Sequence, residues 1–382
     1  MKWVASFDGL AQEAAICAYC GYCRAVCPTY SAVGWESCSP RGRVHLARML
    51  LEGVPLSPSQ AARIYHCTLC GRCSEVCATG IDLRRFWLEA RKTTAERALG
   101  PAGAEEAVRQ AVLSGNIYGY DNDERAGWLD YMDEVPDSLR LGERADLVYF
   151  VGCSSSFSPR AQRIAESFVL LLGETGIQFT LLGKDERCCG YPLLAAGRLA
   201  EARTLIQENV ALCREMSPSA VVFTCPACRL MWMEHYAREL PGVRLLHSTE
   251  YLWALQMEGR LPSFHLESKV AYHYPCDLAR SGGVYDPPRM LLNSVRGLQV
   301  LEISSPSQRE ECCGGGGDLE MVDPSLVAEL AVRRVSRLAG TGADAIVTAC
   351  PQCVRTLSRG AEKAGCQVEV MDVVELLARA RL

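Results

Sequence analysis

Two runs of closely spaced cysteines, which begin at Cys17 and Cys67, constrain the first hundred residues most strongly. Each run has the spacing C-x2-C-x2-C-x3-C. A short loop with a thiolate at every third residue can bind three corners of a cubane iron-sulfur cluster, and a distant cysteine then closes the fourth corner. Gly21 and Gly71 inside the runs allow the tight turns that such loops need.

The two runs are expected to share their ligands. The same run occurs in two-cluster bacterial ferredoxins, where the fourth cysteine of each run binds the other cluster. We therefore expect two cubane [4Fe-4S] clusters. Zinc is the alternative, but it would leave the third cysteine of each run without a role. One cluster would be bound by Cys17, Cys20, Cys23 and Cys77, and the other by Cys67, Cys70, Cys73 and Cys27.

The chain contains 21 cysteines in 382 residues, several times the ordinary usage. A secreted disulfide scaffold is normally short and exported, whereas Asp8 and Glu13 stand where the apolar core of a signal peptide would lie. We therefore expect reduced cysteines and a cytoplasmic location. No apolar run reaches the roughly 18 residues of a membrane span, so any peripheral membrane association would come through a partner. The net charge of −5, without a basic block, gives no reason to expect nucleic acid.

From residue 145 onward the chain repeats itself. The corresponding cysteines of the two halves are offset by 123, 124 or 125 residues, which indicates an internal duplication. Each half has one cysteine, then an adjacent pair, then a C-x2-C motif. The matching sets are Cys153, Cys188, Cys189, Cys225 and Cys228 in the first half and Cys276, Cys312, Cys313, Cys350 and Cys353 in the second.

Each half alternates short β-branched runs with longer helical patterns, which is typical of parallel α/β layering. Its cysteines fall where a strand ends, the edge at which open α/β sheets bind ligands. The expected fold class is α+β/α/β, with a mainly helical two-cluster domain before a duplicated, parallel-sheet α/β domain. We expect the domains to be 1–99 (two clusters), 100–144 (a linker without chemistry), 145–265 (first repeat) and 266–382 (second repeat).

Each repeat supplies five thiols, one more than a cubane cluster uses. Adjacent cysteines could bridge neighbouring irons of an elongated cluster, so the pattern indicates something other than an ordinary cubane. Gly190 and the run Gly314–Gly317 follow the cysteine pairs, and we interpret them as room for a large inorganic ligand. The glycine run is not a phosphate loop, because no Gly-Lys-Ser/Thr follows it.

The spacings C-x34-CC-x35-C-x2-C and C-x35-CC-x36-C-x2-C resemble the cysteine-rich CCG domains of the heterodisulfide reductase family. The order of domains also resembles the iron-sulfur subunits of glycolate oxidase, lactate dehydrogenase and anaerobic glycerol-3-phosphate dehydrogenase, and "CPTY" and "PRGR" are similar to the glycolate oxidase branch. In the heterodisulfide reductase branch each complete motif binds a noncubane [4Fe-4S] cluster. The resemblance therefore implies two noncubane clusters, one on each five-cysteine set.

Three functions fit these residues. The first is an electron-transfer subunit of a multisubunit oxidoreductase. Because no G-x-G-x-x-G turn is visible, we expect no flavin or NAD site in this chain. The resemblance then implies an FAD-containing dehydrogenase of the 2-hydroxyacid, lactate or glycolate type as partner, and a quinone, membrane subunit or other carrier as the second partner.

The alternative is a catalytic heterodisulfide reductase, which uses the cysteine pairs Cys188, Cys189, Cys312 and Cys313. A zinc-stabilised interaction module explains the cysteine count but not the phasing of the runs.

A few residues remain outside these motifs. Cys38, Cys213 and Cys366 are interpreted as small buried hydrophobic residues. His273, three residues before Cys276, could tune a cluster or pass a proton, although a purely structural role is the simpler interpretation. Arg41 and Arg43 could bind an anionic cluster or lie in solvent at the start of a helix, and the sequence leaves both open.

Overall fold

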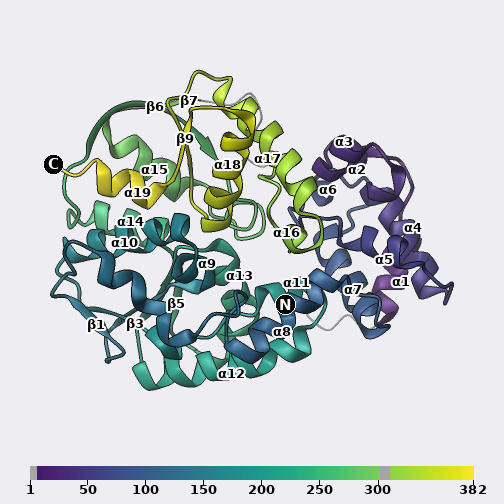
Figure 1. Ribbon diagram of the computed structural model, residues 1–382, viewed down its shortest axis with the longest axis horizontal. Helices are drawn as coiled ribbons and strands as arrows, with labels where there is room; N and C mark the ends of the chain where they lie inside the picture. The colour runs from purple at the N-terminus through teal and green to yellow at the C-terminus, as the bar shows by residue number, and fades with distance from the viewer. Residues whose placement is uncertain (1–6, 302–309) are drawn as a thin grey trace.

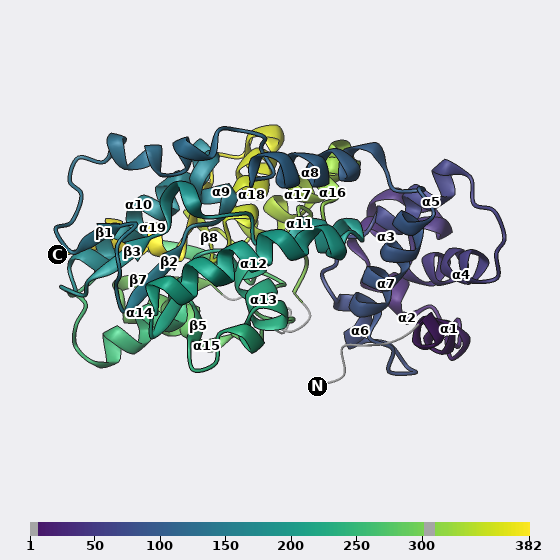
Figure 2. The same ribbon diagram turned by 90° about the horizontal axis from the view of Figure 1, so that it is seen from below.

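The computed structural model describes residues 7–301 and 310–382. Its helical N-terminal part lies at one end of the molecule, and two repeats, each built around a sheet, lie side by side at the other end (Figures 1 and 2). The start of the first predicted domain and residues 302–309, before the second cysteine pair, lie outside the described residues. Within the described ranges, no helix combines the length and the apolar character needed to cross a membrane.

The N-terminal part consists of short helices between the cysteine loops. Ser39 caps one helix through its Oγ, which accepts a hydrogen bond from the Gly42 amide at 2.9 Å, and Ser57 forms a capping box with Gln60 at the start of the next. Gly21 and Gly71 have φ of 85° and 75°, as tight turns before two of the helices require. The helices are α1 (Phe7–Ala15), α2 (Tyr22–Ala25), α3 (Pro28–Val33), α4 (Pro40–Leu51), α5 (Pro58–Tyr65), α6 (Arg72–Glu75) and α7 (Leu83–Glu96).

The segment that the sequence assigns to a linker is ordered secondary structure. It forms helix α8 (Ala102–Ser114), the 3-10 helix η2 (Asn122–Tyr131) and strand β1 (Leu139–Leu141), and β1 pairs in parallel with a strand of the first repeat. Trp128 of η2 is 1% exposed and packs in the core of that repeat. The segment therefore packs against the first repeat, and the predicted domain boundaries themselves stay a prediction.

The first repeat has a five-stranded, entirely parallel sheet with the order β1-β3-β2-β4-β5. Strands β2 and β4 are buried along their whole length, as expected for the centre of a parallel sheet covered by helices. The strands are β2 (Leu147–Phe150), β3 (Phe179–Leu181), β4 (Ala220–Phe223) and β5 (Arg244–His247), and the helices are α9 (Gly152–Phe157), α10 (Pro159–Gly173), α11 (Tyr191–Ala196), α12 (Leu199–Met216), α13 (Pro226–His235) and α14 (Ser248–Met257).

The second repeat has a four-stranded parallel sheet with the order β7-β6-β8-β9. This order matches β3-β2-β4-β5 strand for strand, so the duplication and the predicted fold class are confirmed. The strands are β6 (His265–His273), β7 (Arg296–Leu301), β8 (Ala345–Thr348) and β9 (Glu369–Asp372), and the helices are α15 (Asp286–Ser294), α16 (Leu319–Val322), α17 (Pro324–Ala339), α18 (Pro351–Ala364) and α19 (Val373–Arg379).

Helix α7 ties the N-terminal part to both repeats. The guanidinium of Arg91 is fully buried and donates to four carbonyl oxygens at 2.6 to 3.2 Å. Nearer the start of the same helix, Arg84 lies 3.9 Å from a Glu234 oxygen in the first repeat and 3.8 Å from an Asp277 oxygen in the second. The carbonyls bound by Arg91 belong to Tyr65, Cys67, Ala195 and Gly317.

Candidate metal centres

The fourth cysteine of the first run lies beside the first three cysteines of the second run. All four are buried, and they line one small cavity together with Arg43 and Trp87. The structure thus brings together the crossed ligand set expected from the sequence, although the metal ligation itself stays a prediction. The four cysteines are Cys27, Cys67, Cys70 and Cys73.

Arg43 is the side chain that closes this site. It is 1% exposed, and its Nη2 donates to the Thr29 hydroxyl at 2.5 Å and to the Cys38 carbonyl at 2.6 Å. The same nitrogen lies 3.9 Å from the Cys27 sulfur. Of the two uses that the sequence left open for this arginine, the structure therefore favours a place beside the anionic site. Arg41, by contrast, is partly exposed and pairs with Glu36 at 2.8 Å.

The site expected on the first run is nearer to solvent. Cys20 is exposed, whereas Cys17, Cys23 and Cys77 are half-buried. Burial raises the pKa of Cys23 to about 11 in the metal-free chain. The two N-terminal sites therefore differ in solvent access.

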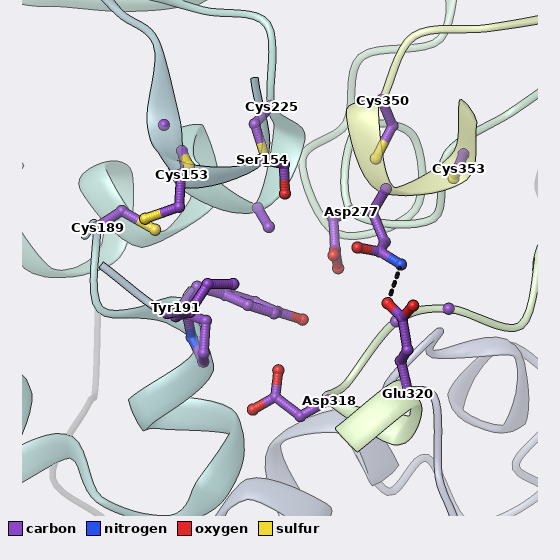
Figure 3. Close-up of a pocket in the computed structure, with 18 of the residues that line it drawn as sticks. Cys153, Ser154, Cys189, Tyr191, Cys225, Asp277, Asp318, Glu320, Cys350 and Cys353 are labelled. Atoms are coloured by element: carbon purple, nitrogen blue, oxygen red, sulfur yellow. Dashed lines mark hydrogen bonds between the residues drawn. The ribbon is translucent and has the colours of Figure 1, made fainter. Parts of the chain in front are cut away.

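Nine of the ten cysteines of the two repeats line one shared cavity of about 110 Å³. They follow the carboxyl ends of neighbouring strands, since Cys153 and Cys225 come after β2 and β4, and Cys276 and Cys350 come after β6 and β8. Figure 3 shows the cysteines of the first repeat on one side of this cavity and those of the second on the other. The cysteines therefore lie at the carboxyl edge of the sheet in both repeats, as the sequence predicted.

The sulfur atoms within each repeat converge without forming disulfides. Cys353 Sγ lies 3.4 Å from Cys313 Sγ, and the amides of Gly314 and Gly315 donate to the sulfurs of the Cys312–Cys313 pair at 3.4 and 3.5 Å. Hydrogen bonds from Cys312 and Cys353 lower the pKa of Cys313 to about 5. In the first repeat, hydrogen bonds from Cys188 and Cys228 lower the pKa of Cys189 to about 6. The same hydrogen bonds raise the pKa of Cys228 and Cys353, so each group of thiols shares its protons. It is the convergence of buried thiols that fits an iron-sulfur group in each repeat.

Cys312 is the one cysteine of the ten that does not line the shared cavity. Its side chain is hydrogen-bonded to Cys70 of the second N-terminal run, and it is also hydrogen-bonded to Cys276. The buried N-terminal site is therefore in direct contact with the cysteines of the second repeat. The cysteines of the first repeat lie on the far side of the shared cavity (Figure 3).

Arg125, in the supposed linker, is a site residue that the sequence analysis missed. It is 2% exposed, pairs with the fully buried Glu186 at 2.8 Å and places Nη2 3.8 Å from Cys153 Sγ. Glu186 in turn accepts the amides of Val151 and Gly152, each at 2.9 Å, directly before Cys153. Burial raises the pKa of Glu186, and the Arg125 charge opposes that rise. A lone arginine in a polar segment gives no sequence signal of this role.

His273 lies close to the cysteines of the second repeat. Its ring, Cys313 and Cys353 have potential ligand atoms within 4.8 Å of one another. The His273 Nδ1 accepts from Arg334 at 3.3 Å, and Arg334 also pairs with the buried Glu310. The ring is therefore held against the predicted cluster site by a second layer of charged groups, rather than lying apart from it.

The glycines after the cysteine pairs also pack closely against other parts of the chain. A Cβ on Gly317, which has φ of 60°, would lie 2.7 Å from the Cys67 carbonyl oxygen, and one on Gly316 would lie 2.8 Å from that of Thr68. A Cβ on Gly190 would meet Ala202 and Met231, both at 3.1 Å. These glycines allow close packing of the chain, and Gly315, Gly316 and Gly317 also line the shared cavity, so the room for a ligand beside them stays a prediction.

Polar side chains occupy the middle of the shared cavity, between the two cysteine groups (Figure 3). Tyr191 comes from the first repeat, and Asp277, Asp318 and Glu320 come from the second. Burial raises the pKa of Asp318 to about 7, against the lowering influence of Arg91. Glu320 accepts from the Gln352 amide at 3.1 Å. Sequence spacing gave no reason to single out any of these four residues.

The three remaining cysteines lie outside all of these groups. Cys38 and Cys213 are fully buried, as expected for small hydrophobic residues, and Cys366 is half-buried. Burial raises the pKa of Cys213 to about 12.

Fold and sites together define an iron-sulfur protein that joins a ferredoxin-type dicluster region to duplicated cysteine-rich α/β repeats. The 4Fe-4S dicluster domain family matches residues 13–81, and the cysteine-rich CCG domain family matches residues 147–232 and 270–358. The chain belongs to the family of heterodisulfide reductase subunits and related iron-sulfur oxidoreductases. It binds iron-sulfur clusters and acts in electron transfer within oxidoreductase complexes.

The relatives differ in how much of their own length the chain covers. A subunit of the dihydromethanophenazine:CoB--CoM heterodisulfide reductase of Methanosarcina acetivorans is 31% identical over 95% of this chain and 93% of that protein. EtfAB:quinone oxidoreductase of Syntrophomonas wolfei is 30% identical over 83% of this chain and 46% of its own length. The probable iron-sulfur-binding oxidoreductase FadF of Bacillus subtilis is 29% identical over 84% and 46%. A hypothetical protein from Helicobacter pylori shares the fold, with a TM-score of 0.53 at 10% identity over 90% of this chain and 67% of that one.

Proposed function

We propose that the chain carries four clusters, two cubane [4Fe-4S] clusters in the N-terminal part and one noncubane [4Fe-4S] cluster in each repeat. When bound, these groups supply one-electron transfer. The crossed sets on the two runs and the five-cysteine sets of the repeats are the proposed ligands. The proposed domains keep the boundaries 1–99, 145–265 and 266–382, with 100–144 as the segment that connects the first two. The observation that carries the proposal is the hydrogen-bonded contact of Cys70 with Cys312, which joins the buried N-terminal site to the second repeat.

In this proposal the chain relays electrons between a redox partner and a second carrier. The exposed position of Cys20 supports a docking partner at the first run, because electron transfer needs a short distance between centres. An FAD-containing dehydrogenase of the 2-hydroxyacid, lactate or glycolate type is the proposed partner, with a quinone or a membrane subunit as the other carrier. The quinone oxidoreductase among the relatives supports a quinone as the second carrier. Peripheral attachment to the membrane would come through such a partner.

Iron and acid-labile sulfide analysis of anaerobically prepared protein tests the cluster number. We expect about sixteen irons and sixteen sulfides per chain, because each of the four clusters holds four irons. A count near eight would limit the clusters to the N-terminal part, and zinc without sulfide would overturn the proposal. Co-purification from the native source tests the partner, and recovery of the chain with no flavoprotein would count against the dehydrogenase.

A second candidate function is reduction of a disulfide in the shared cavity. The observation that favours it is that cysteines of both repeats line one cavity, so a disulfide held there would reach both proposed cluster sites. The reaction would be R–S–S–R′ + 2 e⁻ + 2 H⁺ → R–SH + R′–SH, with electrons from a low-potential redox partner and protons from water through the polar groups of the cavity. The pairs Cys188–Cys189 and Cys312–Cys313 are the proposed catalytic residues of this reaction.

Dye-linked turnover separates the two candidates. Anaerobic protein supplied with reduced viologen should oxidise the dye when a disulfide is added if the second candidate holds, and Cys313→Ser should abolish that oxidation. Dye oxidation by quinone analogues but by no disulfide would leave the relay as the function.

A further inference from the structure

The shared cavity presents carboxylates and a hydroxyl to whatever lies between the two repeats. Figure 3 shows Asp277, Tyr191, Asp318 and Glu320 around it, with Asp318 and Glu320 next to each other at the start of α16. Among the described residues that line the cavity there is no lysine, arginine or histidine. The contact surface available to a ligand is therefore negative or neutral.

Two polar atoms at this surface have room for a further partner. Tyr191 is 7% exposed, and its hydroxyl makes no hydrogen bond of good geometry within the described structure. The hydroxyl nevertheless lies close enough to the Asp277 carboxylate to oppose the rise in its pKa that burial causes. Oδ2 of Asp318 is buried and equally unpartnered. A buried polar atom without a partner costs free energy, so these atoms are placed as if a ligand completes them.

Arginines lie behind the carboxylates rather than in the cavity. Arg84 is 3.8 Å from Asp277, and Arg355 is 3.5 Å from Glu320. The charge of Arg91 opposes the rise in the pKa of Asp318 that burial causes, but the Nη atoms of Arg91 donate their hydrogen bonds to four backbone carbonyls. These cations lower the cost of burying the acids, while the first layer that a ligand touches remains anionic.

We propose that the cavity binds a small thiol or disulfide that carries an ammonium group or another hydrogen-bond donor, and that it discriminates against thiols bearing carboxylate, sulfonate or phosphate groups. Asp318 supplies the counter-charge, since Glu320 is paired with Arg355 and Arg359, and the Tyr191 hydroxyl accepts one further donor. Like charges brought together in a poorly hydrated pocket are strongly unfavourable, so the acids select as much by repulsion as by attraction. This inference rests on the second candidate function and names its substrate class.

The test measures binding separately from reduction. Isothermal titration calorimetry on the oxidised, cluster-loaded protein compares three disulfides of similar size: cystamine (ammonium), bis(2-hydroxyethyl) disulfide (neutral) and dithiodiglycolate (carboxylate). We expect cystamine to bind about tenfold more tightly than the neutral compound, and dithiodiglycolate to bind least. The cystamine preference should weaken when ionic strength rises, but less than it does for a surface site, because the cavity is shielded from solvent.

Three variants locate the effect. Asp318→Asn suits the φ of 57° at this position, because asparagine tolerates the left-handed region, and it should lower the cystamine affinity about tenfold. Tyr191→Phe should lower the affinity for cystamine and for bis(2-hydroxyethyl) disulfide and leave the affinity for dithiodiglycolate unchanged. Glu215→Gln removes an exposed carboxylate remote from the cavity and is the matched control, which should bind as the wild type does.

The outcomes divide cleanly. Three results would overturn the inference. The first is that dithiodiglycolate binds as tightly as cystamine or more tightly, and the second is that no disulfide binds. The third is that Glu215→Gln loses as much cystamine affinity as Asp318→Asn does. Selective cystamine binding without dye-linked reduction would support the inference about the ligand while removing the disulfide reductase function. Reduction of dithiodiglycolate in preference to cystamine would keep that function and reject the ligand class.

Discussion

Nη1 of Arg91 donates to the carbonyl oxygen of Gly317 at 2.8 Å, which links positions 226 residues apart. The same guanidinium also holds the Ala195 carbonyl of the first repeat and the Cys67 carbonyl of the second cysteine run. One buried side chain therefore fixes three parts of the chain around the proposed metal sites. This contact and its neighbours lead to five predictions.

Arg91→Met should destabilise the protein by more than about 2 kcal/mol, because each buried carbonyl left without a donor costs roughly 1 to 3 kcal/mol. Chemical denaturation of the cluster-loaded protein measures the change. Arg97→Met alters an exposed arginine at the end of the same helix and should change stability by less than about 0.5 kcal/mol. Equal effects of the two substitutions would refute the clamp.

Gly317→Ala should cost about 1 to 3 kcal/mol more than Gly365→Ala. The two glycines have φ of 60° and 62°, so the backbone strain of an alanine is the same at both. A Cβ has nothing within 4 Å at Gly365, whereas at Gly317 it meets the Cys67 carbonyl. Thermal unfolding of both variants isolates the steric contribution, and similar midpoints would show that the two chain segments are not in tight contact.

Arg125→Met should destabilise the chain by about 3 to 5 kcal/mol, because it leaves the buried Glu186 charge without its partner. Adding Glu186→Gln should recover part of the loss, since the unpaired charge is then gone. The exposed pair of Arg214 and Glu239 is the control, with side chains 56% and 58% exposed, and Arg214→Met should cost less than about 1 kcal/mol. Urea titrations of all three variants decide the point.

Cys27→Ser should remove or distort the EPR signal of the cluster assigned to Cys67, Cys70 and Cys73 and spare the cluster of its own run. Cys38→Ser is the control, since Cys38 is also buried in the same part of the chain but is no proposed ligand. Loss of the first-run signal instead would mean that the ligation is not crossed.

Cys189→Ser should abolish the signal of the first repeat and leave the ferredoxin-type signals and that of the second repeat. The matched substitution is Cys213→Ser, at a fully buried cysteine of the same repeat outside the five-cysteine set. Low-temperature EPR of dithionite-reduced samples reports each centre, and an unchanged spectrum of Cys189→Ser would remove this residue from the ligand set.

The sequence was sufficient for the parts of the fold that depend on repeated patterns. The matched cysteine spacings predicted the duplication, and the strand orders of the two sheets confirm it. The position of Cys153 and Cys276 after a buried strand predicted the sheet-edge site, because parallel strands end on the same side.

Contacts between distant segments could not be read in the same way. Arg125 lies in a charged segment, and only the folding of that segment onto the first repeat, where β1 pairs with β3, brings it against Glu186. The glycine run packs against the loop of Cys67, and the sequence does not reveal this contact. Asp318 and Tyr191 come from different repeats, so no local pattern predicts that they meet.

The buried position of Cys67, Cys70 and Cys73 beneath the second repeat has a consequence for biogenesis. Arg91 and the Gly316–Gly317 turn cover these thiols in the folded chain. A cluster at the proposed site would therefore have to be loaded before or during docking of the repeats, whereas one at the proposed site of Cys20 would stay accessible to repair.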